Sequence, residues 1–291
     1  MVNNSITTFF HSDLDGIVSY LALCWALGYK PDYVATTPMK LEQDYDKWVE
    51  KKLSNHRLFF LDLDVSKIGH KIDNADTVII DHHQTNIYPF KHAKARITNA
   101  PSCAKMMYEY FLKDKNLSEA RKTLIALADD WDSNSKKLAL SSELNIVFHE
   151  MTNKISSFIQ DYYNGFVPFD KFKLNTIALY KKHVAEYLET MEPFFGEIDF
   201  EGARVKVGAV NCDRYVAECC EHLFDTHEID IAIAVMVRQK RIAVRRSPKN
   251  HLVDVSKFVQ RIASGGGHPA AAGGHLTDEF IEFTKMLKPY K

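Results

Sequence analysis

Clusters of aspartate and histidine follow three apolar runs in the first third of the chain. They stand in FFHSDLDG at 9–16, FFLDLD at 59–64 and VIIDHH at 78–83. Short apolar runs of this kind are typical of buried parallel strands. Because the carboxyl ends of parallel strands gather at one edge of a sheet, we expect these side chains to converge.

The converging side chains predict a metal site. A single Asp after a strand is usually a cap or turn residue, but many carboxylates brought together repel one another, and their pKa values rise unless cations neutralise them. Carboxylate and imidazole ligands without thiolate favour Mn²⁺, and less specifically Zn²⁺, Fe²⁺ or Co²⁺. Two such ions can hold phosphate oxygens and offset charge on a leaving oxygen, so the pattern predicts a binuclear site for phosphoester hydrolysis.

The elements that must position these clusters indicate an α/β protein of two domains. Strand-like runs alternate with helical patterns, which predicts a parallel sheet with flanking helices: 6–10, 17–27, 33–37, 42–53, 57–61 and 77–80. A mostly helical region ends in a connector helix before Pro193, and a second, smaller α/β pattern follows. We therefore expect a catalytic metal-binding domain at 1–190 and a substrate-binding domain at 191–291.

Composition excludes several classes of protein. The 291 residues include 37 Lys+Arg and 38 Asp+Glu, a net charge of −1, so a long basic surface for extended nucleic acid is not expected. Five cysteines without CxxC spacing argue against a disulfide framework and favour a reducing cytoplasm. The longest apolar stretches are too short to span a bilayer, so no membrane association is expected.

A glycine-rich segment, SGGGHPAAAGG at 264–274, is expected to be a loop whose backbone approaches a phosphate closely. A strand ending in Arg245 and Arg246 precedes it, and alternation along that strand should turn one arginine towards the ligand. In the first domain, Ser102 stands where a helix should begin. Its hydroxyl can contact an anion, although an N-cap is the commoner role of such a serine.

The motifs together resemble the DHH phosphoesterase family. HSDLDG, LDLDVS, DHHQT and ADDWD are similar to its four-motif series, and the glycine-rich segment resembles the glycine motif of its DHHA1 substrate domain. The N-terminal H-x-D-x-D-G, the run NAPSCAKMMYEYF and a D-x-W motif look most similar to the NrnB-like nano-RNase, or oligoribonuclease, branch. The resemblance spans nearly the whole chain.

The resemblance implies roles for individual residues. It assigns His11 and Asp13 to one metal, Asp62 to a bridging position, and three further ligands to the other metal, namely Asp15, His82 and Asp129. In the fourth motif the D-x-W spacing favours Asp129, with Asp130 as the alternative.

The remaining site residues surround the metals. Asp81 is expected to support the site, and His83 is expected either to contact phosphate or protonate the leaving oxygen, or to be a hydrogen-bonded orienting residue. Substrate contacts are expected from Ser102 and, in the second domain, from the residues that the family motif matches: His268, Arg246, Gly266 and Gly267.

We therefore predict a metal-dependent phosphodiesterase that hydrolyses short oligoribonucleotides to mononucleotides. The alternatives on the same site are a pAp phosphatase, a cyclic or linear dinucleotide phosphodiesterase and an exopolyphosphatase. A non-catalytic nucleotide sensor is a different class, and the complete set of competent metal ligands argues against it. The resemblance also implies a homodimer, and no other protein partner is predicted.

Overall fold

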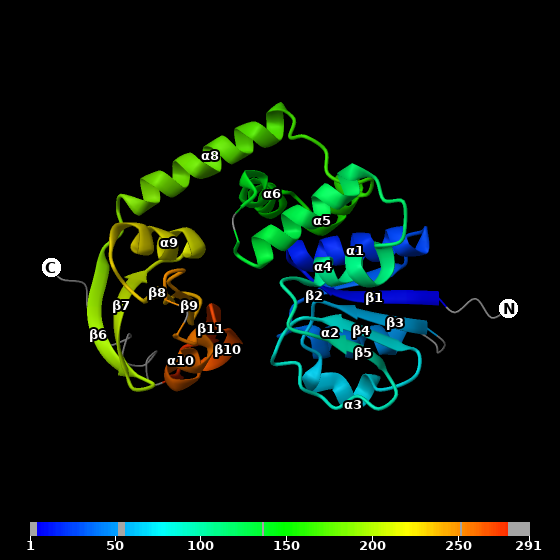
Figure 1. Cartoon of the computed structure of the whole chain (residues 1–291), viewed down its shortest axis with the longest axis horizontal. Coiled ribbons are helices and arrows are strands. Elements are labelled where there is room, and N and C mark those ends of the chain that lie inside the picture. The colour runs from blue at the N-terminus through cyan, green and yellow to red at the C-terminus, as the bar shows by residue number, and fades with distance from the viewer. Residues whose placement is uncertain (1–4, 52–55, 136, 251, 279–291) are drawn as a thin grey trace. The chain divides into compact units, whose positions relative to one another are not determined.

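The computed structural model describes residues 5–51, 56–135, 137–250 and 252–278. The chain folds as two compact units, Met1–Ala178 and Leu179–Lys291 (Figure 1). The division falls inside helix α8 (Lys171–Leu188), which the sequence analysis assigned wholly to the first domain.

The first unit is built on a five-stranded parallel sheet. Its strands are β1 (Ser5–His11), β2 (Asp32–Thr36), β3 (His56–Leu61), β4 (Thr77–Asp81) and β5 (Lys94–Ile97), in the order β2-β1-β3-β4-β5. All neighbouring pairs run parallel, which confirms the predicted α/β class. The carboxyl ends of β1, β3 and β4 therefore meet at one edge of the sheet.

Alternation along the strands divides the core of this unit between two faces of the sheet. Phe10, Phe59 and Leu61 pack in one cluster with residues of α1 (Leu14–Leu27), α4 (Cys103–Met107), α5 (Glu119–Asp132), α6 (Ala139–Glu150) and α7 (Lys154–Tyr162). Phe9 and Phe60 point the other way, to a cluster with residues of α2 (Leu41–Lys51), the 3₁₀ turn Ser66–Ile68 and α3 (Gly69–Ile72). The buried sheet thus has helices on both faces, as parallel sheets require.

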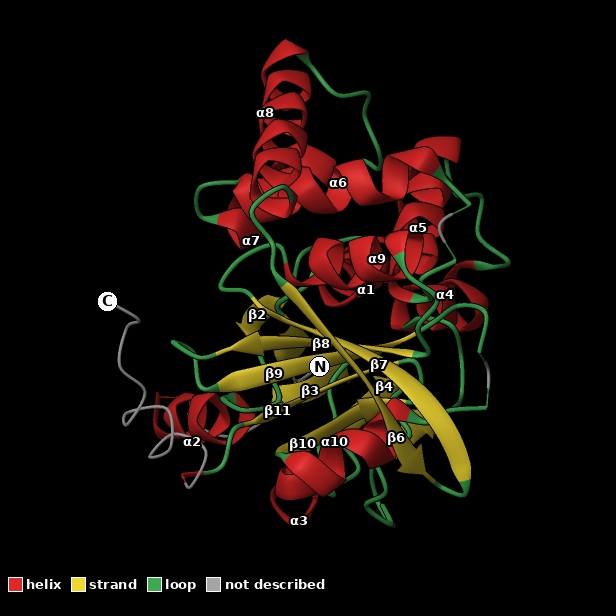
Figure 2. Cartoon of the chain, turned by 90° about the vertical axis from the view of Figure 1, so that its left-hand side faces the viewer, coloured by secondary structure: helices red, strands yellow, loops and turns green. Residues whose placement is uncertain are grey.

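The second unit is a six-stranded mixed sheet (Figure 2). Its strands are β6 (Pro193–Phe200), β7 (Ala203–Asn211), β8 (Ile231–Met236), β9 (Arg241–Arg246), β10 (Ser264–His268) and β11 (Ala271–His275), in the order β10-β11-β9-β8-β7-β6. Only the β7–β8 pair is parallel. Helices α9 (Val216–Thr226) and α10 (Val255–Ile262) pack in separate hydrophobic clusters with this sheet.

The glycine-rich segment forms the β10–β11 hairpin, so the expectation of a loop was wrong. A Cβ on Gly265 would lie 2.1 Å from the carbonyl oxygen of Gly273 on the opposite strand. A Cβ on Gly274 would lie 3.0 Å from side-chain atoms of Val259 and Ala263 at α10. The missing side chains therefore let the two strands pair and the helix pack closely, which is a structural reason for these glycines.

All five cysteines are buried and free of disulfides. Among the described residues, no helix combines the length and the apolar character needed to cross a lipid bilayer.

Candidate metal centre

Asp62 lies at the centre of the converging side chains. It follows the last residue of β3, is 2% exposed, and has a left-handed backbone with φ of 57° that Asp tolerates better than most residues. Its Oδ1 lies 3.2 Å from Nε2 of His82, and its Oδ2 lies 3.6 Å from Nδ1 of His11. The two carboxylate oxygens thus face two different histidines, as expected of a bridging ligand.

The first group of potential ligands is His11, Asp13 and Asp62. His11 ends β1, and its Nδ1 lies 2.7 Å from Oδ2 of Asp13. The other oxygen of Asp13 accepts a hydrogen bond from the amide of Gly16 at 3.0 Å, so this carboxylate also caps α1 and is held in place. One donor atom from each of the three residues lies within 4.8 Å of the other two, close enough to share one ion.

The second group is Asp15, Asp62 and His82, whose donor atoms also lie within 4.8 Å of one another. Nδ1 of His82 lies 3.2 Å from the carbonyl oxygen of Ala100. When Nδ1 carries the proton and donates it there, the lone pair of Nε2 faces the carboxylates, an arrangement common in metal-binding histidines. Asp15 accepts hydrogen bonds from the amides that begin α4, those of Cys103 (2.7 Å) and Ala104 (2.8 Å).

In the fourth motif the structure brings Asp132, rather than Asp129, to the cluster. Oδ2 of Asp132 lies 3.4 Å from Nε2 of His82. Asp129 instead accepts a hydrogen bond from the Ser102 hydroxyl at 2.6 Å. The alternative ligand, Asp130, accepts from four groups of the following segment: the Ser135 and Ser141 hydroxyls and the amides of Lys137 and Leu138. Asp132 is also part of the fourth motif, but the D-x-W spacing favoured Asp129. Residues three apart share a helix face, so spacing alone does not choose between positions 129 and 132.

Ser102 caps helix α4 and is fully buried. Its hydroxyl accepts a hydrogen bond from the amide of Lys105 at 3.1 Å and donates to Asp129. The substrate contact expected of Ser102 is therefore replaced by the capping role, because both hydrogen-bonding functions of the hydroxyl are satisfied within the protein.

Asp81 and His83 form a hydrogen-bonded pair, and with Asp62 they make a third group whose donor atoms lie within 4.8 Å of one another. Oδ1 of the fully buried Asp81 lies 2.7 Å from Nδ1 of His83. Its Oδ2 accepts from the side-chain amide of Asn86 at 2.7 Å. Asn86 also donates to the carbonyl oxygen of Leu63 and is buried, so it fixes Asp81, a role for which the sequence carries no motif. Burial would lower the pKa of His83, but Asp81 outweighs burial and raises it.

The pKa values of the ligand candidates show why the cluster needs positive charge. Burial, followed by the charge of Asp62, raises the pKa of Asp15 and brings that of Asp132 to about 7. For His11 burial acts in the opposite direction, yet neighbouring carboxylates raise its pKa to about 11. Burial would also raise the pKa of Asp62, but hydrogen bonds from His11 and His82 keep it below its usual range. Without metal, protons must neutralise these carboxylates, and divalent cations fit the same donor set.

The second unit brings together part of the predicted substrate site. The amide of Arg246, at the end of β9, donates to the carbonyl oxygen of Ala270 at 2.9 Å, so Arg246 adjoins the hairpin turn that follows His268. Gly267 has φ of 149°, and a Cβ there would clash with the carbonyl of Ala271. For Gly266, in contrast, the nearest atom to a Cβ is 4.0 Å away, so packing does not require this glycine.

Comparison with known proteins defines the class. Residues 5–129 match the family model described as "DHH family, N-terminal domain". This match over residues 5–129 agrees with the predicted resemblance to the DHH family, and the prediction of a phosphoesterase is confirmed.

Among particular relatives, the chain is 24% identical to oligoribonuclease NrnB of Bacillus subtilis (strain 168), over 94% of this chain and 73% of that protein. A pGpG-specific phosphodiesterase, PggH from Vibrio cholerae, superposes with a TM-score of 0.60 at 15% identity, covering 97% of this chain and 96% of that one. RecJ from Thermus thermophilus in complex with Mn²⁺ has a TM-score of 0.55 at 12% identity, covering 97% of this chain and 51% of that one. The two structural likenesses show a shared fold.

Proposed function

We propose that this DHH protein is a phosphodiesterase that hydrolyses short oligoribonucleotides to mononucleotides by a two-metal mechanism. The observation that carries the proposal is the buried carboxylate of Asp62 after β3, whose two oxygens face His11 and His82 and which belongs to both the His11–Asp13 group and the Asp15–His82 group of potential ligands. The names of two relatives, an oligoribonuclease and a pGpG phosphodiesterase, support a short nucleotide substrate.

We assign His11 and Asp13 to one ion, Asp15, His82 and Asp132 to the other, and Asp62 to both. Mn²⁺ is our proposed metal, because the donor set mixes carboxylate and imidazole and because a RecJ of similar fold is complexed with Mn²⁺. Bound metals would activate a water molecule and neutralise charge on phosphate oxygens. The protein's own contribution is orientation, since separate hydrogen bonds from the chain hold Asp13, Asp15 and His82.

We assign His83 as the group that protonates the leaving oxygen and Asp81 as its positioning residue. The 2.7 Å contact with Asp81 occupies Nδ1 of His83, so Nε2 is the atom for proton donation. The raised pKa favours the protonated ring that a general acid requires.

We propose that the second unit binds a substrate phosphate through Arg246, His268 and the backbone near Gly266. The absence of a packing reason for Gly266 supports this role, since a ligand can approach backbone without a side chain closely. The near-neutral charge of the chain favours short substrates over long ones. Free, buried thiols agree with our proposal of a cytoplasmic protein.

The test is a Mn²⁺-supplemented time course on labelled RNAs of two to about twenty nucleotides, pGpG, pAp, a cyclic dinucleotide and polyphosphate. Wild type is compared with Asp62→Asn and with Asp64→Asn. Asp64 is a matched control from the same LDLD motif, because among the described residues its carboxylate joins none of the ligand groups and accepts a hydrogen bond from the Ser66 amide at 2.9 Å. Asn can still accept this bond.

Rapid loss of the shortest RNAs in wild type and Asp64→Asn, but not in Asp62→Asn, is the expected result. Preference for pAp, the cyclic dinucleotide or polyphosphate would refute the proposed substrate while leaving the site assignment intact. Equal activity of Asp62→Asn and wild type would refute the site itself.

A further inference from the structure

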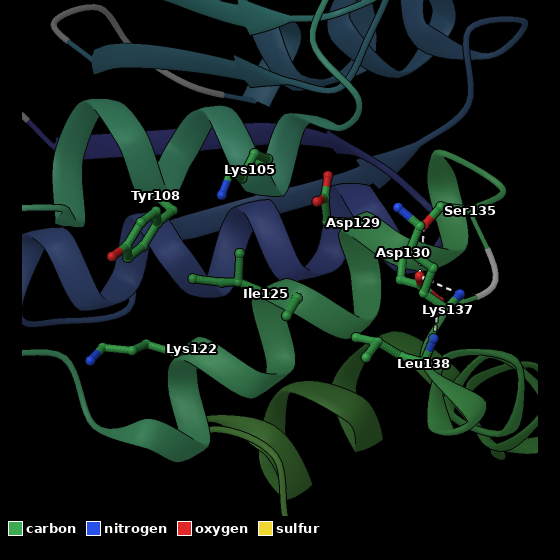
Figure 3. Close-up of a pocket in the computed structure, with 10 residues that line it drawn as sticks. Lys105, Tyr108, Lys122, Ile125, Asp129, Asp130, Ser135, Lys137 and Leu138 are labelled. Carbon is green, nitrogen blue, oxygen red and sulfur yellow. Dashed lines mark hydrogen bonds between the residues drawn. The ribbon is translucent and has the colours of Figure 1, made fainter.

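A pocket apart from the metal centre lies in the first unit, between α4 and α5. Its volume is about 510 Å³, within the range of small-molecule sites. The lining residues include three lysines, a tyrosine and apolar side chains: Lys105, Lys122, Lys137, Tyr108, Ile125 and Leu138. Figure 3 shows Tyr108 and Lys122 towards one end, Lys137 and Leu138 towards the other, and Ile125 between them. None of these side chains belongs to the groups of potential ligands around Asp62.

The helix that carries Tyr108 has an unusual local structure. Residues Tyr108–Leu112 form a π-helical turn directly after α4, and π-helical turns are frequent at functional sites. The turn places the half-buried Tyr108 ring in the pocket wall, with the ammonium of Lys105 5.5 Å from the ring centroid. An aromatic ring thus lies beside a cation, a combination that suits a base linked to a phosphate.

The charges that border the pocket leave the lysines available to an anion. Lys105 lies 3.5 Å from Glu109 and Lys122 lies 2.8 Å from Glu119, and exposed ion pairs of this kind are weak and exchange readily. The bordering carboxylates have internal partners instead: Asp129 accepts from Ser102, and Asp130 accepts from the segment that forms the rim. A phosphate can therefore replace the glutamates as the partner of the ammonium groups.

We propose that this pocket binds a nucleoside monophosphate, with its phosphate on Lys105 and Lys122 and its base against Tyr108 and Ile125. The residues that line the pocket differ from the proposed substrate residues of the second unit, and the proposal does not depend on the proposed reaction. Because the pocket is lined by lysines and by aromatic and apolar side chains, it should bind a phosphate linked to a base more tightly than phosphate alone.

The test is calorimetric titration of the full-length, Mn²⁺-supplemented protein with AMP, adenosine and inorganic phosphate. A Lys105→Gln/Lys122→Gln variant removes two cations of the pocket. Lys113→Gln is the matched control, because Lys113 pairs with Glu109 at 3.2 Å, as Lys105 does, but does not line the pocket. His268→Ala reports binding at the proposed substrate site of the second unit, and thermal melting checks that each variant folds.

We expect AMP to bind at least tenfold more tightly than adenosine or phosphate. Its affinity should fall at least tenfold in the double variant and stay within twofold of wild type in Lys113→Gln and His268→Ala. Unchanged affinity in the folded double variant, loss of all AMP binding in His268→Ala, or phosphate binding as tight as that of AMP would each overturn the proposal.

Discussion

The fourth motif offers a sharp test, because neighbouring aspartates have opposite roles. The carboxylate of Asp130 is 6% exposed and accepts four hydrogen bonds, which outweigh burial and lower its pKa from 3.8 to about 2. Asp132 lies 3.4 Å from His82, and burial and Asp62 raise its pKa to about 7. We therefore compare Asp130→Ala with Asp132→Ala: the first should lose stability and the second activity.

The expected loss of stability in Asp130→Ala follows from the hydrogen bonds that lower the pKa of Asp130. One pKa unit corresponds to about 1.4 kcal/mol, so the lowering of the Asp130 pKa from 3.8 to about 2 corresponds to roughly 2.5 kcal/mol, an upper value because the carboxylate borders an open pocket. The Ser141 hydroxyl, which donates to Asp130 at 2.6 Å, also lies 2.8 Å from the carbonyl oxygen of Leu138, so the substitution still leaves it an acceptor. We expect Asp130→Ala to lower the free energy of unfolding by up to about 2.5 kcal/mol and to retain activity per folded molecule.

Asp132→Ala should behave in the opposite way. Loss of an outer-shell partner of a metal ligand costs about 10–100-fold in activity, so loss of a direct ligand should cost at least about 100-fold. Stability of the metal-free protein should not fall, because the substitution removes a carboxylate that Asp62 repels. Urea unfolding measures the stability of each variant, and initial rates on a dinucleotide measure its activity. An Asp130→Ala variant that is stable but inactive, or an Asp132→Ala variant with wild-type rates, would refute the assignment of these two roles. The stability difference for Asp130 should also shrink as pH falls from about 4 towards 2, where the wild-type carboxylate becomes protonated.

Three further predictions concern the metal-free state, the proton donor and the hairpin. In the folded, metal-free protein the pKa of Asp132 (about 7) and that of His11 (about 11) lie above the ordinary values of these groups. The free energy of unfolding should therefore fall as pH rises from about 4 through 7 and on towards 11, and Mn²⁺ should reduce this fall. Thermal melts in EDTA and in Mn²⁺ measure the difference. His83→Gln should lower kcat by about 10²–10⁴-fold with little change in the affinity for Mn²⁺. Loss of Mn²⁺ binding in this variant would show instead that His83 is a metal ligand. Gly265→Ala should destabilise the protein by more than about 1 kcal/mol, because its Cβ would clash with the opposite strand. Gly266→Ala should have the melting temperature of wild type but a raised KM. Equal melting temperatures of the two variants would contradict the packing reason given for Gly265.

The sheet edge could be predicted from the sequence because the signal is local. Alternating or continuous apolar residues define β1, β3 and β4, and the polar residue that follows each strand must lie at the same edge of a parallel sheet. The position of Asp62 and its neighbours followed from that rule. Strand β5 was missed since KARI is short and mostly exposed, with too few apolar residues to show a period.

Tertiary packing decided the features that the sequence left open. Asp129 and Asp132 lie on one helix face, and only the position of the helix end relative to His82 selects Asp132. The glycines of β10 and β11 resemble a loop in sequence, because their structural reason is the approach of another strand and of α10. Asn86 lies in an irregular segment, and its role depends on Asp81, to which it donates at 2.7 Å.

The central claim is that one carboxylate joins two metal sites, and Mn²⁺ stoichiometry tests it most directly. Calorimetric titration, with electron paramagnetic resonance of the same samples, should find two spin-coupled ions per chain in wild type and in Asp64→Asn. Asp62→Asn should lose the coupling and bind at most one ion tightly, because Asp62 contributes to both ligand groups. A single ion in wild type, or two coupled ions in Asp62→Asn, would contradict the account.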